Sequence, residues 1–101
     1  MRSKYSEVIG DLIKNERLNR KMTLRELADK ASLYYGKKIN HTSLMRYENE
    51  GRSMDIDVLI AILKAQGIDF AEFMDNVQQI VEREERWINS GKGNLLNWIF
   101  K

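Results

Sequence analysis

Apolar residues recur along this chain of 101 residues mainly at spacings of three and four, which is the period of an amphipathic helix. The first such stripe predicts a helix over about residues 4–19, and its members are Tyr5, Val8, Ile9, Leu12 and Ile13. No segment alternates apolar and polar residues over the length of a strand. The pattern therefore predicts an all-α fold.

Capping signals mark the start of a second helix. Thr23 and Glu26 have the spacing of a capping box, in which each side chain accepts a hydrogen bond from the other residue's backbone amide. Met22 and Leu27 flank this pair at the spacing of a hydrophobic staple. Both signals place the start of the helix at Thr23. Its buried face is expected to consist of Leu24, Leu27, Ala28 and Ala31.

Polar capping residues delimit two more helices. Asn40 is a favoured N-cap residue before a helix that ends at residues 49–51. Ser53 or Asp55 caps a fourth helix over residues 56–66, which is apolar on nearly all sides. A helix of this kind usually lies at the centre of a core.

A fifth and longer helix follows Asp69, which repeats the capping-box spacing with Glu72. Its apolar positions continue over several turns, as far as a polar, glycine-containing break at residues 89–94. We therefore expect residues 1–75 to form the main domain and residues 76–101 to form a helical C-terminal extension.

Composition argues against several classes of function. The chain has no Cys and a single His, so disulfides, thiolate nucleophiles and Cys- or His-based metal sites are not expected. Ser43 and His41 are two residues apart, which places them on different sides of a helix, and no acid is placed to orient the His. We expect neither an enzyme nor a cofactor or metal.

The hydropathy pattern also argues against a membrane segment. The longest uninterrupted apolar run covers six residues, 58–63, whereas spanning a bilayer takes about 20. No apolar stretch follows the N-terminal Met-Arg-Ser-Lys, so no secretory signal is expected. The expected location is the cytoplasm.

Charge is distributed unevenly along the chain. Residues 1–53 contain 12 Lys and Arg against 7 Asp and Glu, whereas residues 54–101 contain 5 against 8. A basic half joined to an acidic half indicates that one face meets a polyanion. An ordinary solvated surface explains the same charges equally well, so charge alone does not decide the function.

The second and third helices have the form of a helix-turn-helix, in which the second of two short helices begins with small polar residues. Over residues 9–73 the sequence resembles the phage-repressor-like helix-turn-helix family of transcriptional regulators, the Xre/Cro type. The residues that carry the resemblance are Ile9-Gly10, Ile13, Arg17, Thr23-Leu-Arg-Glu-Leu-Ala28, Ser43-Leu-Met-Arg-Tyr-Glu48-Asn49, Leu59, Ile62-Leu63, Ala65 and Gly67-Ile68. The resemblance implies a compact five-helix, lambda-repressor-like DNA-binding domain.

The resemblance also implies which residues contact the bases of DNA. They are Asn40, His41, Thr42 and Arg46. In a helix-turn-helix, the first turn of the second helix enters the major groove, where Arg pairs with guanine and Thr contacts a thymine methyl or a phosphate. Simpler interpretations stay open for three positions. The alternative for Asn40 is that it serves only as an N-cap. The alternative for His41 is that it is exposed and makes no functional contact, and the alternative for Arg46 is that it binds a phosphate rather than a base.

Phosphate contacts are expected on both sides of the third helix, from Arg25, Lys37, Lys38, Asn49, Arg52 and Ser53. The alternative for each is an ordinary solvated side chain. The family also commonly pairs an Arg of the first helix with a Glu of the third. Here these positions fall on Arg17 and Glu48, which implies a partly buried structural ion pair rather than two unrelated surface charges.

The sequence departs from the family in the connection over residues 32–39, which is longer than the usual short turn. We expect the second helix to extend to Tyr35, Gly36 to be its C′ residue, and Ile39 to plug the core. The insertion leaves the register of the third helix open. Leu24 stands where the family often has a Gln that contacts phosphate, so that contact is lost or is replaced by Arg25.

The C-terminal extension carries more apolar surface than a small helical core can cover, and such a surface usually marks an interface. We expect it to form a homodimer or to bind a regulatory protein; the alternative is that it folds back on its own core. The apolar residues concerned are Val77, Val81, Trp87, Ile88, Leu95, Leu96, Trp98, Ile99 and Phe100.

The expected function is that of a sequence-specific DNA-binding transcriptional regulator. The sequence favours a repressor of phage, plasmid or bacterial origin that binds an inverted-repeat operator in double-stranded DNA as a dimer. The alternative is a protein-interaction module, an antitoxin-like or anti-repressor subunit that acts through the apolar C-terminal tail.

Overall fold

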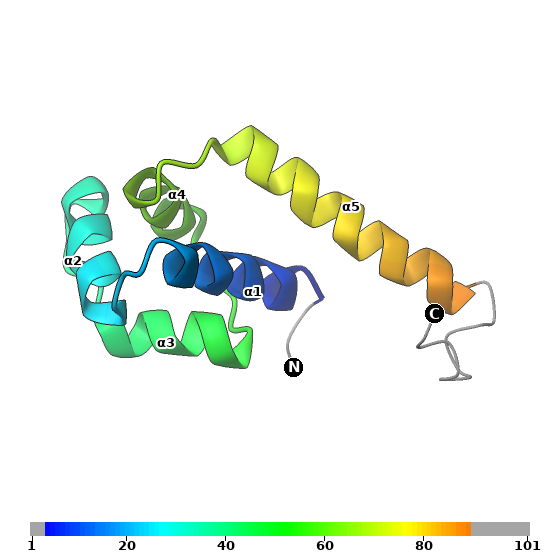
Figure 1. The fold of residues 1–101 in the computed structure, drawn as a ribbon, viewed down its shortest axis with the longest axis horizontal. Coiled ribbons are helices and arrows are strands. Elements are labelled where there is room, and N and C mark those ends of the chain that lie inside the picture. Colours follow the sequence, from blue (N-terminus) through cyan, green and yellow to red (C-terminus); the bar gives the residue numbers. More distant parts are fainter. Residues whose placement is uncertain (1–3, 90–101) are drawn as a thin grey trace.

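The computed structural model describes residues 4–89 and the side chains of residues 4–85. This part of the chain folds into helices alone, with no strand, so the predicted all-α fold is confirmed. The helices are α1 (Lys4–Asn19), α2 (Leu24–Tyr35), α3 (His41–Glu50), α4 (Ile56–Ala65) and α5 (Phe70–Asn89) (Figure 1). Within the described residues, no helix is both long and apolar enough to cross a membrane.

The ends of α2 follow the signals in its sequence. The amide of Glu26 donates to Thr23 Oγ1 at 3.0 Å, and the amide of Thr23 donates to Glu26 Oε1 at 2.8 Å, which completes the capping box. At the other end Gly36 has a φ of 82°, and its amide donates to the Ser32 carbonyl oxygen at 3.0 Å. The expected extension of α2 to Tyr35, with Gly36 beyond it, is therefore confirmed.

Two of the other N-caps make no capping hydrogen bond, and one does. Asn40 and Asp55 occupy the N-cap positions of α3 and α4, but neither side chain makes a capping hydrogen bond. Before α5, Asp69 Oδ2 accepts from the amide of Glu72 at 3.0 Å. The exposed side chain of Asn40 is thus not engaged by the helix that it precedes.

Packing places α1 at the centre of the molecule. It contacts α3 on one side and α5 on the other, while α2 packs against α4 and α3 (Figure 1). A side chain at Gly10 would overlap the Tyr47 carbonyl oxygen, so glycine is needed where α1 and α3 approach each other. The α4 helix contributes six buried side chains to the core, which are Val58, Leu59, Ala61, Ile62, Leu63 and Ala65.

The α5 helix belongs to this core as far as Val81. Val77 and Val81 are 0% exposed, and Lys4 Nζ of α1 lies 3.2 Å from Glu84 Oε1. The interface expected at Val77 and Val81 is therefore wrong, because the chain's own core already covers both side chains. The expected division after residue 75 falls inside α5, so the helix joins the two predicted segments.

The other apolar residues assigned to the interface lie beyond what the structure describes. This holds for the side chains of Trp87 and Ile88 in the last turn of α5. It also holds for the tail residues Leu95, Leu96, Trp98, Ile99 and Phe100.

Candidate nucleic-acid interface

The α3 helix is held against α1 by a bidentate ion pair. Arg17 Nε donates to Glu48 Oε2 at 2.8 Å, and Arg17 Nη2 donates to Glu48 Oε1 at 3.0 Å. Arg17 Nη1 also donates to the Met22 carbonyl oxygen at 2.8 Å, in the turn before α2. The side chains of Arg17 and Glu48 are 10% and 0% exposed, so the expected structural pair is present and largely buried. One guanidinium thus ties α1, the turn before α2, and α3 together.

The buried and exposed residues of α3 separate by helical register. Leu44 and Glu48, one turn apart, are 0% and 3% exposed and face the core. Thr42 and Arg46, also one turn apart, are exposed. The structure therefore directs the second pair outward, away from the residues that hold the helix in place.

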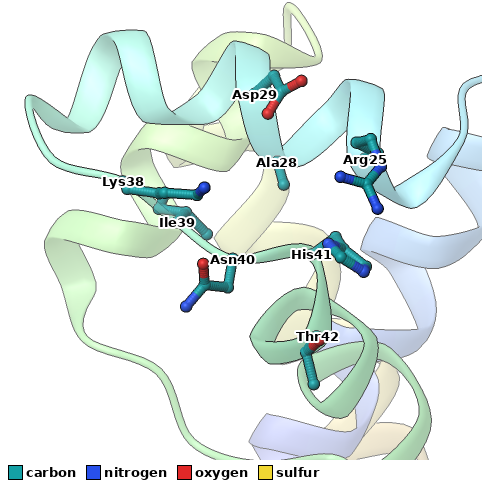
Figure 2. A pocket seen from close by; sticks show the side chains of 8 residues that line it. All are labelled: Arg25, Ala28, Asp29, Lys38, Ile39, Asn40, His41 and Thr42. Atoms are coloured by element: carbon teal, nitrogen blue, oxygen red, sulfur yellow. The ribbon is translucent and has the colours of Figure 1, made fainter.

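A pocket lies between α2 and the beginning of α3 (Figure 2). It is lined by Arg25, Ala28, Asp29, Lys38, Ile39, Asn40, His41 and Thr42. The side chains of Arg25 and His41 extend towards each other from the two helices, and Lys38 and Asn40 come from the connection between them (Figure 2). The pocket brings together three of the four predicted base-contacting residues and two of the predicted phosphate-contacting residues.

The long connection between α2 and α3 is anchored from inside. Ile39 is 6% exposed, so the plug expected from the sequence is confirmed. The amide of Ile39 donates to Ser32 Oγ at 2.8 Å, and Ser32 Oγ in turn donates to the Ala28 carbonyl oxygen at 2.7 Å. These bonds join the connection to α2, and they determine where the neighbouring Lys38 and Asn40 emerge.

Four predicted phosphate-contacting residues lie elsewhere. Lys37 lines a second pocket between α2 and α4, together with Tyr34, Tyr35, Asp57, Ile60, Ala61 and Lys64. The other three lie at and beyond the far end of α3 and already have partners in the chain. Asn49 Oδ1 accepts from Lys14 Nζ at 2.9 Å, and Arg52 Nε donates to Glu50 Oε1 at 3.1 Å. Ser53 Oγ lies 3.1 Å from Ser6 Oγ.

Two polar residues near these sites were not predicted from the sequence. Asp29 places a carboxylate in the pocket of Figure 2, one helical turn after Arg25 on the exposed face of α2. The sequence signal that could have identified Asp29 is its i, i+4 spacing with Arg25. Lys14 meets Asn49 from α1, and no local pattern connects residues so far apart in the chain.

Charge separates the two sides of the molecule. The α5 helix carries Glu72, Asp75, Glu82, Glu84 and Glu85 against Arg83 and Arg86. The α5 helix lies across α1 from α3 (Figure 1). An anionic ligand is therefore disfavoured on the α5 side of the molecule.

Tyr47 is the titratable residue of α3 with a shifted pKa. Burial raises the pKa of the Tyr47 phenol above its ordinary value of 10.0, and the neighbouring charge of Asp55 and the Tyr35 phenol raise it further. Arg52 acts in the opposite direction. Among the described residues, no group of His, Asp and Glu side chains could hold a metal ion.

Comparison with solved structures finds the same fold in a bacterial protein. The chain superposes on the clp gene regulator ClgR from Corynebacterium glutamicum with a TM-score of 0.70. The alignment covers 95% of this chain and 94% of that one, at 18% sequence identity. No protein-family model matches the sequence, and a search of curated proteins finds no match. The likeness to the regulator is one of fold.

Proposed function

We propose that the protein is a DNA-binding transcriptional regulator that reads the major groove with the N-terminal half of α3. The observation that carries this proposal is the exposure of Thr42 and Arg46 on a helix that Glu48 and Arg17 hold against α1. Asn40 and His41 line the pocket beside Thr42. A base-reading helix must present side chains to DNA while its own position is fixed. The similar fold of a protein described as a gene regulator supports the same conclusion.

The side chains at the start of α3 suit the edges of bases. Arg46 is exposed and can pair with guanine through two hydrogen bonds, which distinguishes guanine from other bases by roughly 1–3 kcal/mol. Asn40 makes no capping bond, so its amide is available to an adenine edge or a phosphate. His41 and Thr42 add further donors and acceptors beside it.

Phosphate contacts are proposed at both ends of α3. Arg25 and Lys38 flank the first turn of the helix, and Asn49 and Arg52 lie near its other end. Asn40 and Asn49 are separated by about 13 Å along a helix axis at 1.5 Å per residue, close to the major-groove width of about 12 Å. The two groups are thus spaced to reach the two walls of one groove. The bond of Asn49 uses its Oδ1, so its Nδ2 can still donate to a phosphate. The pair of Arg52 with Glu50 is exposed, so a phosphate can compete for Arg52.

We further propose that the regulator binds an inverted repeat as a homodimer and represses by occupying its operator. One small module makes few phosphate contacts and binds weakly at cellular salt concentration, whereas two modules spaced by about 34 Å read two half-sites. Because Val77 and Val81 are buried in the core, we assign the dimer contact to the apolar residues that follow them in the sequence. These residues are Trp87, Ile88, Leu95, Leu96, Trp98, Ile99 and Phe100.

The test is a selection of fragmented genomic DNA with the purified full chain at near-physiological salt. Three proteins are compared: the wild type, the triple variant His41→Ala, Thr42→Ala, Arg46→Ala, and a control variant Gln78→Ala, Gln79→Ala, Arg83→Ala. The control removes one positive charge and two polar groups from exposed positions of α5. Its side chains lie on the acidic side of the molecule, away from the proposed DNA surface.

We expect the wild type and the control to enrich the same inverted repeat, and the α3 variant to enrich none. Enrichment by all three proteins alike would contradict reading by α3. Enrichment by none of them would contradict sequence-specific DNA binding altogether, and a half-site without its inverted copy would contradict the dimer.

A further inference from the structure

One exposed side chain of α3 is apolar. Met45 is 38% exposed, and of the large hydrophobic residues that the described part of the chain leaves exposed, it alone lies on α3. It packs neither in the buried core nor among the partly buried residues around that core. Packing within the chain therefore leaves 38% of this residue open to solvent.

The helical register places Met45 on the surface proposed to meet DNA. It follows Thr42 by three residues and directly precedes Arg46, and both of these side chains are exposed. Glu48, three residues after Met45, is buried, so Met45 lies at the edge between the exposed and the buried side of the helix. Met45 thus lies among polar groups, where it exposes its side chain to water when no ligand is bound.

The chemistry of the major groove offers this side chain one kind of partner. The groove presents hydrogen-bond donors and acceptors at each base pair, and its apolar feature is the C5-methyl group of thymine. A methionine side chain is flexible and polarisable, so it adapts to an irregular apolar surface. Burying a methyl group against it removes apolar area from water on both partners.

We propose that Met45 is a specificity-determining residue that packs on a thymine C5-methyl group in the operator half-site. The inference rests on the proposed DNA-reading function and adds a thymine to what that function recognises. Neighbouring Cα atoms are about 3.8 Å apart, and base pairs rise by about 3.4 Å. Side chains of adjacent helix residues diverge, so the thymine should lie within a few base pairs of the base that Arg46 contacts.

The experiment uses the operator recovered with the full chain and replaces each thymine of the half-site in turn by deoxyuridine. This change removes the C5-methyl group and leaves the hydrogen-bonding groups in place. Affinities are measured for the wild type, Met45→Ala and Met45→Leu, and thermal unfolding of each protein checks that the fold is unchanged. Leucine keeps an apolar side chain of similar volume, so it is the matched control.

We expect removal of one particular methyl to weaken wild-type binding roughly three- to tenfold, the scale of one buried methyl or methylene group. Met45→Ala should bind the thymine operator more weakly and be insensitive to that substitution, whereas Met45→Leu should stay sensitive. The proposal is overturned if no methyl matters to the wild type, or if Met45→Ala responds as the wild type does. Either result, obtained on an enriched operator, would leave DNA reading by α3 intact, whereas failure to enrich any operator would overturn both proposals.

Discussion

At the scale of single residues, the buried guanidinium of Arg17 determines how α3 is oriented, and therefore which side of α3 is exposed. Its guanidinium contacts Glu48 through two nitrogens and the Met22 carbonyl through the third. The carboxylate of Glu48 has no exposed surface of its own. Its charge is therefore stabilised by Arg17 rather than by water, and the orientation of α3 depends on that bond.

We expect Arg17→Ala to lower the free energy of unfolding by about 3–5 kcal/mol, because it leaves the buried Glu48 carboxylate without a counter-charge. Urea denaturation of the variant and the wild type measures this loss. Arg20→Ala is the control, since Arg20 pairs with Glu16 on the partly exposed surface of α1, where such pairs contribute about 0–1 kcal/mol. Equal losses in the two variants would show that the Arg17 pair has no special structural role.

The raised pKa of Tyr47 predicts that the stability of the fold depends on pH in the alkaline range. Its folded pKa lies above the value of 10.0, chiefly because of burial, so the folded state holds the phenolic proton more tightly than the unfolded chain does. The resulting stabilisation is complete below pH 10.0 and is lost as the pH rises from there through the folded pKa.

The variant Tyr47→Phe has no phenol to titrate, so its free energy of unfolding should fall less than that of the wild type between pH 9 and pH 11 (about one unit on either side of the ordinary tyrosine pKa). Urea titrations across that interval measure both proteins. Parallel pH profiles would contradict a raised pKa for Tyr47.

At the scale of helices, local sequence determined most of what could be predicted. The capping box at Thr23, the glycine after Tyr35 and the buried Ile39 each depend on neighbours within a few residues, and the structure has all three. The partners of Asn49 and Ser53 come from α1, more than thirty residues earlier in the chain. Such contacts depend on how helices pack, which no local pattern specifies.

The two N-caps of the proposed DNA-binding helices should differ in their contribution to stability. Thr23→Ala removes a capping hydrogen bond and should cost about 1 kcal/mol of unfolding free energy. Asn40→Ala removes no such bond, so its cost should be clearly smaller. Thermal or urea unfolding compares them.

DNA affinity should rank the same two variants in the opposite order, because Asn40 is proposed to contact DNA. If Asn40→Ala is the more destabilising variant and binds DNA normally, Asn40 is a cap and not a contact.

At the scale of the whole molecule, α5 is where the sequence was least informative. Its apolar stripe predicts an amphipathic helix, but the same stripe suits a dimer interface and a core-packing helix equally. The structure assigns Val77 and Val81 to the core, next to α1. Whether a stripe is covered by its own chain depends on where the preceding four helices leave open surface, and that is a property of the complete fold.

The α5 helix also makes the distribution of charge over the molecule uneven. The acidic residues of α5 lie across α1 from α3, so the negative charge of the second half of the chain is concentrated on one side of the molecule (Figure 1). Long-range repulsion should therefore turn α5 away from DNA before any base is contacted.

Base reading by α3 is tested by comparing Arg46→Ala and Arg83→Ala for binding to the enriched operator and to unrelated DNA at one salt concentration. Both variants lose one exposed arginine, from α3 and from α5 respectively. We expect Arg46→Ala to lose roughly 5- to 150-fold in operator affinity relative to unrelated DNA, the value of one bidentate contact with guanine. Arg83→Ala should keep the wild-type ratio. If both variants keep the wild-type ratio, α3 does not read the bases of the operator through Arg46.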